Sequence, residues 1–332
     1  MNNLAPIVLF AYARPEHTLR TLEALAANTL AKESALYIYI DGPKKGKEEG
    51  LAIKDERLTI IEERVKEVRR IAHSKQWCGQ VEIIEQPQNK GLAASIRDGV
   101  TDIVTKYGRV IVMEDDLVTS PAFLTYMNKA LDFYESYPAV FSIGGYSYPA
   151  SRMAIPEDYP YDTYACLRNC SWGWATWKDR WEKVDWSAAH YGTLKQSPAM
   201  KEAFNRMGDD EFEMFWMQQE KGLNIWSVLF TMAHFEHHAV AIIPCQSYVD
   251  NIGLDGSGEN CGTQVALSHS QLNTNENPKF LDVVYEDKRI INAFYNVNCR
   301  QKRPYYQRIC NWIARKMKVQ APFQIKKRIY NQ

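Results

Sequence analysis

The first 145 residues alternate short apolar runs with segments whose apolar residues recur every three or four positions. The runs predict strands at Pro6–Tyr12, Ala35–Asp41, Val81–Gln86, Arg109–Asp116 and Val140–Ile143. The periodic segments predict helices at Pro15–Asn28, roughly Glu48–His73, Leu92–Tyr107 and Pro121–Tyr134. Strands so rich in Val and Ile are typical of a sheet covered on both faces. We therefore expect an α/β fold with a mostly parallel, Rossmann-like sheet and helices on both faces, whose ligand binds beyond the carboxyl ends of the strands.

The pattern becomes irregular after Gly144 and Gly145. The next stretch is rich in Trp, Tyr, Met and His, and only Pro198–Met207 and Phe212–Lys221 have helical spacing. We expect three regions, namely a ligand-binding α/β half (1–145), a second half built onto the same sheet (146–291) and a basic C-terminal tail (292–332).

The charge of the chain is balanced overall but not along its length. The 40 Lys and Arg equal the 40 Asp and Glu, so no net field attracts nucleic acid, and we expect no such partner. After Lys288 there is no Asp or Glu, whereas Arg289 and ten further basic residues follow. The apolar residues on one face of the predicted tail helix are Ile309, Trp312, Ile313 and Met317. Such a tail predicts contact with an anionic membrane surface, and the alternative is a helix packed on the rest of the protein.

Cysteines and the N-terminus indicate the compartment. The seven scattered cysteines form neither a disulfide framework nor a paired zinc pattern. The first residues have no basic segment and too short an apolar run for a signal peptide. We expect a cytoplasmic protein, peripheral on the inner face of the plasma membrane if the tail binds lipid.

Three consecutive carboxylates follow the fourth predicted strand. The apolar residues Val110–Met113 lead directly into Glu114, Asp115 and Asp116. Adjacent acids repel one another, and a divalent cation such as Mn²⁺ or Mg²⁺ relieves that repulsion, usually together with substrate phosphates. The sequence therefore predicts a metal site at this strand end, and the alternative is a solvated acidic turn.

Polar residues follow the other strands too. Arg14 stands in a first turn without the glycines of a dinucleotide site, and its guanidinium suits a diphosphate unless Glu16 or Glu23 pairs with it. Asp41 ends the second strand, where it either accepts hydrogen bonds from a base or makes an Asp-Gly-Pro turn. After the third strand, Asn89-Lys90-Gly91 opens a helix and suits a ribose or phosphate, with simple capping by Asn89 as the alternative.

The chain resembles glycosyltransferases of the GT-A fold, bacterial family 2-like sugar transferases in particular. Glu114-Asp115-Asp116 is similar to the Asp-any-Asp motif of that fold, in the form found in N-acetylglucosaminyltransferase I. The other segments that carry the resemblance are Phe10–His17, Asn89–Leu92, Ser171–Trp177 and Asp250–Gly258. The resemblance implies a metal-dependent, inverting glycosyltransferase of surface polysaccharide or lipopolysaccharide synthesis. It would move a hexosyl or N-acetylhexosaminyl group from a nucleotide-sugar donor, UDP-sugar favoured, to a glycan or lipid-linked acceptor.

The resemblance also implies roles for individual residues. Asp116 would be the metal ligand, with Glu114 and Asp115 nearer the ribose and base. The full set expected to bind the donor is Phe10, Tyr12, Arg14, Asp41, Asn89, Lys90, Gly91, Glu114 and Asp115. The set expected to bind the acceptor is Trp172, Gly173, Trp174 and Asp255, with Trp172 and Trp174 stacking on a sugar. Trp177 and Trp181 are expected in the core.

An inverting transfer needs a carboxylate that takes the acceptor proton. We favour Asp210, ahead of the other candidates Asp209, Glu211, Glu213 and Glu220, although Gln218 and Gln219 stand where relatives carry an acid. For the run His234–His238 we expect ordinary helix-end histidines rather than a metal site. The open alternatives for the whole chain are a sugar nucleotidyltransferase, a catalytically silent carbohydrate- or nucleotide-binding homologue, and a lipid-docking adaptor.

Overall fold

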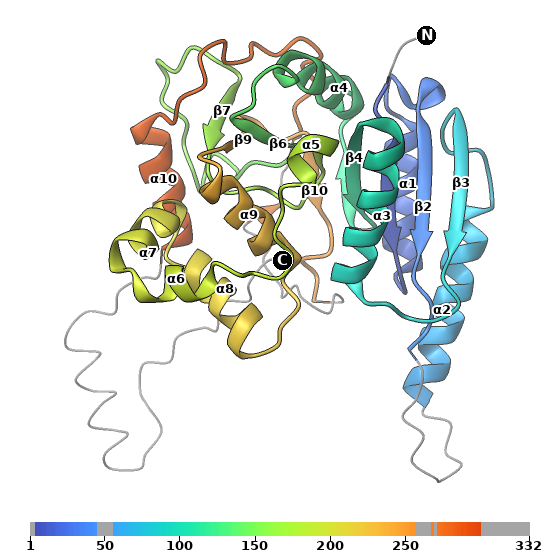
Figure 1. Ribbon diagram of the computed structural model, residues 1–332. Helices are drawn as coiled ribbons and strands as arrows, with labels where there is room; N and C mark the ends of the chain where they lie inside the picture. Colours follow the sequence, from blue (N-terminus) through green and yellow to red (C-terminus); the bar gives the residue numbers. More distant parts are fainter. Residues whose placement is uncertain (1–3, 45–55, 257–266, 269–270, 300–332) are drawn as a thin grey trace, which may run out of the picture.

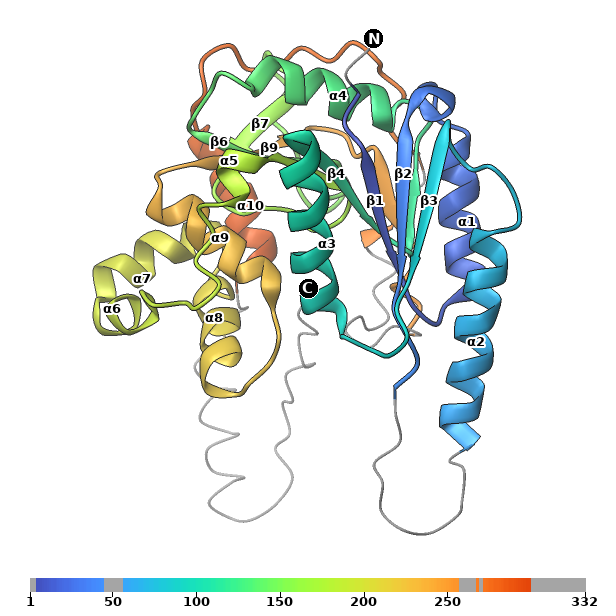
Figure 2. The ribbon, with the colours of Figure 1, turned by 45° about the vertical axis from the view of Figure 1, so that its right-hand side comes forward.

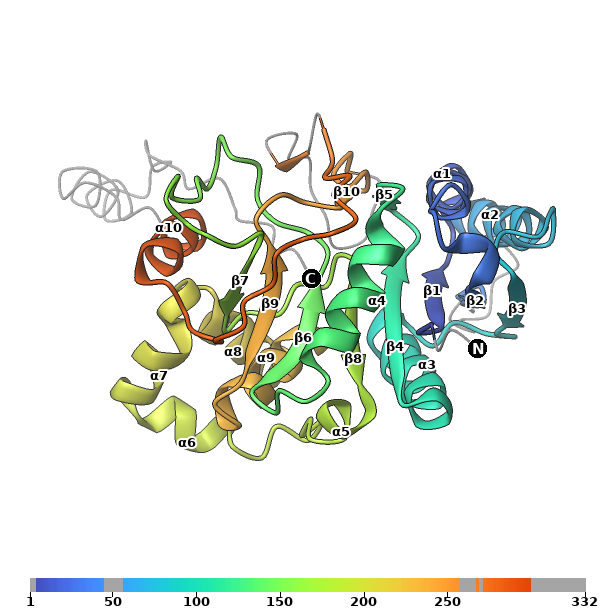
Figure 3. The same ribbon diagram turned by 90° about the horizontal axis from the view of Figure 1, so that it is seen from above.

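The computed structural model describes residues 4–44, 56–256, 267–268 and 271–299. Its centre is one eight-stranded sheet with the order β3-β2-β1-β4-β8-β6-β9-β7 (Figure 1). The strands are β1 (Ile7–Ala11), β2 (Ala35–Ile40), β3 (Gln80–Glu85), β4 (Arg109–Glu114), β6 (Val140–Gly144), β7 (Thr163–Cys166), β8 (Trp174–Trp177) and β9 (Val240–Pro244). Seen from above, they follow one another from β3 to β7 across the molecule (Figure 3). The predicted α/β fold is confirmed.

The first four strands in the sheet are parallel, as the strand–helix alternation predicts. Beyond β4 the sheet is mixed, because β8 runs antiparallel to both β4 and β6. The pair β6 and β9 is parallel again, and β7 is antiparallel to β9. The two halves of the chain thus share one sheet, and β8 is the strand that joins them.

Helices cover both faces of the parallel strands (Figure 2). On one face, α1 (Pro15–Ala26) and α2 (Glu56–Ala72) pack their apolar side chains against Leu9 and Ile38. On the other face, α3 (Leu92–Tyr107) packs against Val8 and Phe10. Odd and even positions of β1 therefore serve two separate cores, which explains its continuous apolar sequence.

Helices from both halves of the chain pack around β6–β9. These are α4 (Phe123–Tyr134), α5 (Lys178–Trp181), α6 (Tyr191–Gln196), α7 (Pro198–Phe204), α8 (Glu211–Glu220), α9 (Trp226–Glu236) and α10 (Lys288–Asn298). A short antiparallel ribbon, β5 (Leu117–Thr119) with β10 (Val249–Asn251), adjoins the end of β4. Two short 3-10 helices, η1 (Ala31–Glu33) and η2 (Asn205–Met207), complete the elements. None of the helices in the described residues is long and apolar enough to cross a membrane.

Several predicted boundaries change in the structure. The helix expected from about residue 48 is described from Glu56 onward, and 45–55 lie outside the described residues. The helix α9 was not predicted, because its side chains are buried almost all round and leave no polar face to reveal a helical period. The tail beyond residue 299, with its predicted helical face, also lies outside the described residues.

Candidate functional site

The three acids occupy the carboxyl end of β4. Glu114 is the last residue of the strand, and Asp115 and Asp116 form the turn that leads into β5. Asp115 is 3% and Asp116 4% exposed, so the solvated acidic turn considered for this sequence is excluded. The backbone carbonyl of Asp115 accepts a hydrogen bond from the Thr21 hydroxyl at 2.9 Å, which fixes the turn against α1.

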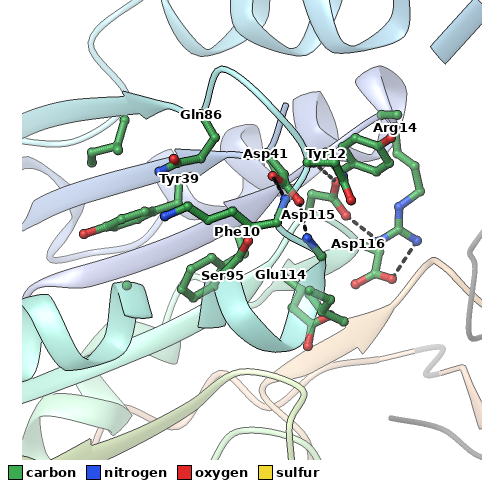
Figure 4. Close-up of a pocket in the computed structure, with 18 of the residues that line it drawn as sticks. Phe10, Tyr12, Arg14, Tyr39, Asp41, Gln86, Ser95, Glu114, Asp115 and Asp116 are labelled. Atoms are coloured by element: carbon green, nitrogen blue, oxygen red, sulfur yellow. Dashed lines mark hydrogen bonds and ion pairs between the residues drawn. The ribbon is translucent and has the colours of Figure 1, made fainter. Parts of the chain in front are cut away.

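Arg14 links two of the acids (Figure 4). Its guanidinium forms an ion pair with Asp115, and its Nη1 lies 2.9 Å from Asp116 Oδ2. The backbone N–H of Tyr12 donates to Asp115 Oδ2 at 3.1 Å. The first β–α turn and the end of β4, about a hundred residues apart in the chain, are thereby joined through charge-assisted hydrogen bonds.

The acidic cluster has more negative charge than Arg14 alone can balance. Burial raises the pKa of Glu114 well above its usual range, and the neighbouring Asp116 charge raises it further. Burial also raises the pKa of Asp116, against the opposing effect of Arg14. Among the described residues, Glu114 Oε1 has no hydrogen-bond partner. The cluster is therefore suited to a further cation.

A divalent ion can bind at these residues only if further ligands complete its coordination. No group of three His, Cys, Asp or Glu side chains within the described part of the chain is arranged to hold a metal ion. A buried Asp116 carboxylate with surplus negative charge beside it fits an ion that takes its remaining ligands from substrate phosphates and water. The residues thus fit the expected Mn²⁺ or Mg²⁺ as a shared ion, bound together with a nucleotide.

A loop from the second half closes against the acids. The backbone N–H of Ile252 donates to the Asp116 carbonyl at 2.9 Å. At the end of this loop, Asp255 Oδ2 lies 3.2 Å from His17 Nε2 of α1. The structure therefore groups Asp255 with the residues expected to bind the donor, and not with the acceptor residue Trp172. His17, which the sequence analysis did not single out, also faces this site.

Asp41 organises the loop that opens α3. Its Oδ1 accepts the backbone N–H groups of Gly42 at 2.9 Å and Lys90 at 2.8 Å, and its Oδ2 accepts that of Gly91 at 3.0 Å. The Asn89 side chain donates to the Gly42 carbonyl at 3.1 Å. Gly91 has φ of +82°, which favours glycine at the start of this helix. Both oxygens of Asp41 are thus engaged in positioning the loop, including a turn of the kind expected for Asp-Gly-Pro.

These groups surround one cavity of about 840 Å³ along the carboxyl ends of β1, β2 and β4. Every residue expected to bind the donor or the metal lines it, as does Asp255: Phe10, Tyr12, Arg14, Asp41, Asn89, Lys90, Gly91, Glu114, Asp115 and Asp116. The aromatic ring of Tyr39 packs on Phe10 with centroids 5.5 Å apart and adds to the lining. The cavity has the size of a cofactor or nucleotide site.

A second, smaller cavity of about 80 Å³ lies in the other half of the sheet. Tyr146 and Trp172 contribute aromatic rings that meet edge to face with centroids 4.5 Å apart. Arg168 and Glu211 contribute a buried ion pair, with Arg168 Nε 2.8 Å from Glu211 Oε1. Sequence reasoning did not find Arg168, because nothing local to residue 168 reveals its partners more than forty residues away.

The predicted bases divide into buried and exposed groups. Both oxygens of Asp210 accept hydrogen bonds from Arg168 Nη1, at 3.0 and 3.1 Å, and Asp210 is 6% exposed. Burial raises the pKa of its neighbour Glu211 to about 7. Glu220 lies at the far end of α8, exposed and 2.6 Å from Lys195 Nζ, and it lines neither cavity.

Glu211, and not Asp210, lines the second cavity. Neither Asp209 nor Glu213 lines either cavity. At the second cavity, Glu211, the first residue of α8, therefore takes the place expected of the preceding residue, Asp210.

Two of the predicted acceptor residues are structural. Trp174 is 1% exposed and stacks on Trp226 with centroids 5.3 Å apart, so it cannot stack on a sugar. Gly173 has φ of +67°, and its carbonyl accepts the Gly145 N–H at 2.6 Å. The burial of Trp174 contradicts its expected stacking on a sugar, and Gly173 forms a turn. Of this segment's predicted acceptor residues, Trp172 lines the second cavity. Trp177 and Trp181 are buried, as expected.

His234 is an ordinary buried histidine. Its Nε2 lies 2.8 Å from the Ser142 hydroxyl and its Nδ1 lies 2.7 Å from the Phe230 carbonyl. Burial lowers the pKa of His234 to about 4, so the ring is neutral near pH 7. The hydrogen bonds of this ring agree with a helix-end role.

Comparisons with known proteins give distant structural likenesses alone. No family model and no curated protein matches the sequence. The apo form of mouse xyloside xylosyltransferase 1 is 12% identical with a TM-score of 0.34, and the match covers 72% of this chain and 84% of that one. A UTP-bound UGPase from Acinetobacter baumannii is 10% identical with a TM-score of 0.36, covering 75% and 89%. The galactosyltransferase LgtC, in complex with donor and acceptor sugar analogues, is 7% identical with a TM-score of 0.31, covering 69% of each chain.

Proposed function

We propose that this protein is a metal-dependent glycosyltransferase that moves a sugar from a nucleotide-sugar donor to a hydroxyl of a glycan or lipid-linked acceptor. The observation that carries the proposal is the buried cluster of Glu114, Asp115 and Asp116 at the end of β4, facing Arg14 across a cavity of about 840 Å³. Buried acids with one arginine for three carboxylates are suited to a substrate that brings both a diphosphate and a cation.

In this proposal the larger cavity holds the donor. Arg14 binds the diphosphate through its forked N–H donors, and Asp116 holds Mn²⁺ or Mg²⁺ together with diphosphate oxygens. The bound ion would neutralise the charge that develops on the departing nucleoside diphosphate. Phe10, Tyr12 and Tyr39 supply aromatic surface for the nucleoside, and a UDP-sugar is the favoured donor.

Asp41 has a positioning role in the same proposal. Two of the three N–H groups that it accepts, those of Lys90 and Gly91, hold the Asn89–Gly91 loop at the wall of the cavity. The loop then presents Lys90, whose side chain is 43% exposed and lines the cavity. Because this ammonium is exposed at the cavity wall, contact with a phosphate or ribose hydroxyl is a better explanation of its position than a buried structural role.

The acceptor hydroxyl must lose its proton to a carboxylate. We propose the pair Asp210 and Glu211, which Arg168 joins by contacts of 2.8–3.1 Å. Glu211 is the better placed of the two because it lines the second cavity, and its pKa of about 7 suits proton transfer near neutral pH.

The biological setting is a further part of the proposal. The resemblance to family 2-like transferases favours surface polysaccharide or lipopolysaccharide synthesis, with the basic segment 292–332 bringing the enzyme to an anionic membrane surface where a lipid-linked acceptor resides. This part rests on sequence alone.

The direct test is slow donor hydrolysis, in which water replaces the acceptor. Wild-type protein with Mn²⁺ should release UDP from one UDP-sugar, and Asp116→Asn should reduce the rate at least about 100-fold. Asp158→Asn, which changes a carboxylate that is 72% exposed, is the control and should keep the wild-type rate. Release of pyrophosphate from UTP and a sugar phosphate, without UDP release, would replace the proposal with a nucleotidyltransferase.

A further inference from the structure

The second cavity contains buried polar atoms that no part of the described chain satisfies. The Asn169 amide oxygen accepts the Thr231 hydroxyl, whereas its Nδ2 has no hydrogen-bond partner. The hydroxyl of Tyr164 also has none. Asn169 is 8% and Tyr164 0% exposed, and both residues line the cavity. Buried donors without partners destabilise a fold, so their retention at one cavity indicates a ligand that accepts hydrogen bonds.

The charge at this cavity favours a neutral ligand. Arg168 is already paired with Asp210 and Glu211, so no free positive charge remains to hold a phosphate or carboxylate. Burial raises the pKa of the Tyr164 hydroxyl well above its usual range, so this group stays protonated and able to donate. The second cavity thus offers hydrogen-bond donors but no net positive charge.

The remaining walls are apolar and aromatic. Met214, Val228 and Ile243 line one part of the cavity, and the ring of Trp172 lies beside it. A ligand group that combines a hydrogen-bond acceptor with a small apolar end matches this lining. The acetamido group of an N-acetylated sugar has both, namely a carbonyl oxygen and a methyl group, and the sugar ring has apolar faces that stack on aromatic side chains.

The cavity is also close to the donor site. β4 and β6 both run antiparallel to β8, so their carboxyl ends lie at the same edge of the sheet. Glu114, which ends β4, lines the larger cavity, and Tyr146, two residues after β6, lines the second. Cys170 lines the second cavity. Both sites therefore lie along the same edge of the sheet, where β4 and β6 end.

We propose that the second cavity is a recognition pocket for the acetamido group of an N-acetylated sugar, with Asn169 and Tyr164 donating to its carbonyl. This proposal deepens the proposed function and rests on it, because the proposed function is what makes the ligand a sugar substrate. The acetamido group belongs either to the acceptor or to the sugar of the nucleotide donor, and both sources present the same chemistry to the pocket.

Tyr164→Phe is the most informative variant, because it removes a hydroxyl that has no hydrogen-bond partner among the described residues and leaves the ring in place. It should unfold at a temperature equal to or above that of the wild type. Tyr159→Phe is the matched control, because the Tyr159 hydroxyl donates to the Thr163 carbonyl at 3.0 Å and does not line the cavity. The control should lose stability and keep sugar recognition.

The experiment measures binding to the full chain by saturation-transfer NMR and calorimetry. The probes are methyl N-acetyl-β-glucosaminide against methyl β-glucoside, and UDP-N-acetylglucosamine against UDP-glucose, with Mn²⁺. Wild type should prefer the acetylated member of one pair by about tenfold or more, with the strongest saturation on the acetyl methyl group, and Tyr164→Phe should lose the preference. A preference within the first pair would assign the acetamido group to the acceptor, and a preference within the second pair would assign it to the sugar of the nucleotide donor.

Equal binding of both members in both pairs, with UDP binding intact, would overturn the pocket assignment and leave the glycosyltransferase proposal standing. A preference that Tyr164→Phe does not change would also overturn it. Acetamido preference in a protein that binds no nucleotide under any metal condition would instead keep the pocket and refute the transferase.

Discussion

Gly253 packs directly against Asp116, so that a Cβ atom at residue 253 would stand 2.1 Å from Asp116 Oδ2. The same atom would stand 2.9 Å from Arg14 Nη1. Real side chains do not approach so closely, so a larger residue at position 253 would have to displace the Asp116 carboxylate and the Arg14 guanidinium that pairs with it. The loop of the second half is in this way part of the site built by the first half.

The first prediction concerns this contact. Gly253→Ala should displace the Asp116 carboxylate and reduce metal-dependent nucleotide affinity by about tenfold or more, because ligand and cation both need that carboxylate in place. Gly192→Ala is the matched control, since a Cβ at residue 192 meets no atom within 4 Å. Calorimetric titration of UDP with Mn²⁺ into both variants measures the effect. Wild-type affinity in Gly253→Ala would show that the close approach has no bearing on binding.

The second prediction concerns competition between Arg14 and the metal. Arg14 Nη1 occupies Asp116 Oδ2 at 2.9 Å in the free protein, so Mn²⁺ alone should bind weakly and a nucleotide that draws Arg14 away should strengthen metal binding. Arg14→Gln should bind Mn²⁺ without nucleotide more tightly than wild type does, by about tenfold, and should lose the dependence on UDP. Electron paramagnetic resonance of free Mn²⁺ measures both quantities.

Arg20→Gln, in the helix α1 that follows Arg14, serves as the control, because Arg20 is exposed and lines neither cavity. It should behave as wild type does. If Arg14→Gln instead binds Mn²⁺ more weakly than wild type in the absence of nucleotide, Arg14 does not compete with the metal for Asp116.

Much of the fold and of the larger cavity could be predicted from sequence, because both depend on local rules. Periodicity located β1, β2, β3 and β4, and the carboxyl ends of parallel strands must meet at one edge, which brings Arg14, Asp41 and the acids together. Which carboxylate pairs with Arg14 could not be predicted in this way. Local spacing favours Glu16 or Glu23, whereas the fold brings Asp115 and Asp116, about a hundred residues away.

Trp172 and Trp174 show a second limit of prediction from the sequence. Trp172 and Trp174 are two residues apart, a spacing that would put both on one face of a continuous strand. The positive φ of Gly173, +67°, turns the chain between them. Trp172 consequently packs in the core of α1 and α4, and Trp174 in the core of α3 and α9. Nothing in the sequence around Gly173 specifies that turn without the tertiary contacts to Phe123 and Val249.

The third prediction follows from the pKa of Glu211. Burial raises the pKa of Glu211 from 4.5 to about 7, so the folded state holds this proton more tightly than the unfolded state does. As pH rises from about 4.5 to 7, the unfolded carboxyl ionises first, and the folded protein loses stability. Glu211→Gln has no proton to lose at this position. Between pH 5 and pH 8 its free energy of unfolding should therefore rise, relative to that of wild type, by on the order of 2 kcal/mol.

Urea unfolding of both proteins at the two pH values measures this difference, in which the contributions of all other titrating groups cancel. Parallel pH dependence of the two proteins would mean that Glu211 is ionised at neutral pH in the folded state, and would remove the reason to prefer it over Asp210 as proton acceptor.

The central claim is that the acids at the end of β4 bind a nucleotide through a divalent cation. Calorimetric titration of UDP, GDP and dTDP into wild type and Asp116→Ala, with and without Mn²⁺, tests it most directly. We predict that UDP binds wild type in the presence of Mn²⁺ and that this binding is lost in Asp116→Ala. Failure of all three nucleotides to bind wild type under either metal condition would contradict the claim, and would favour a catalytically silent homologue.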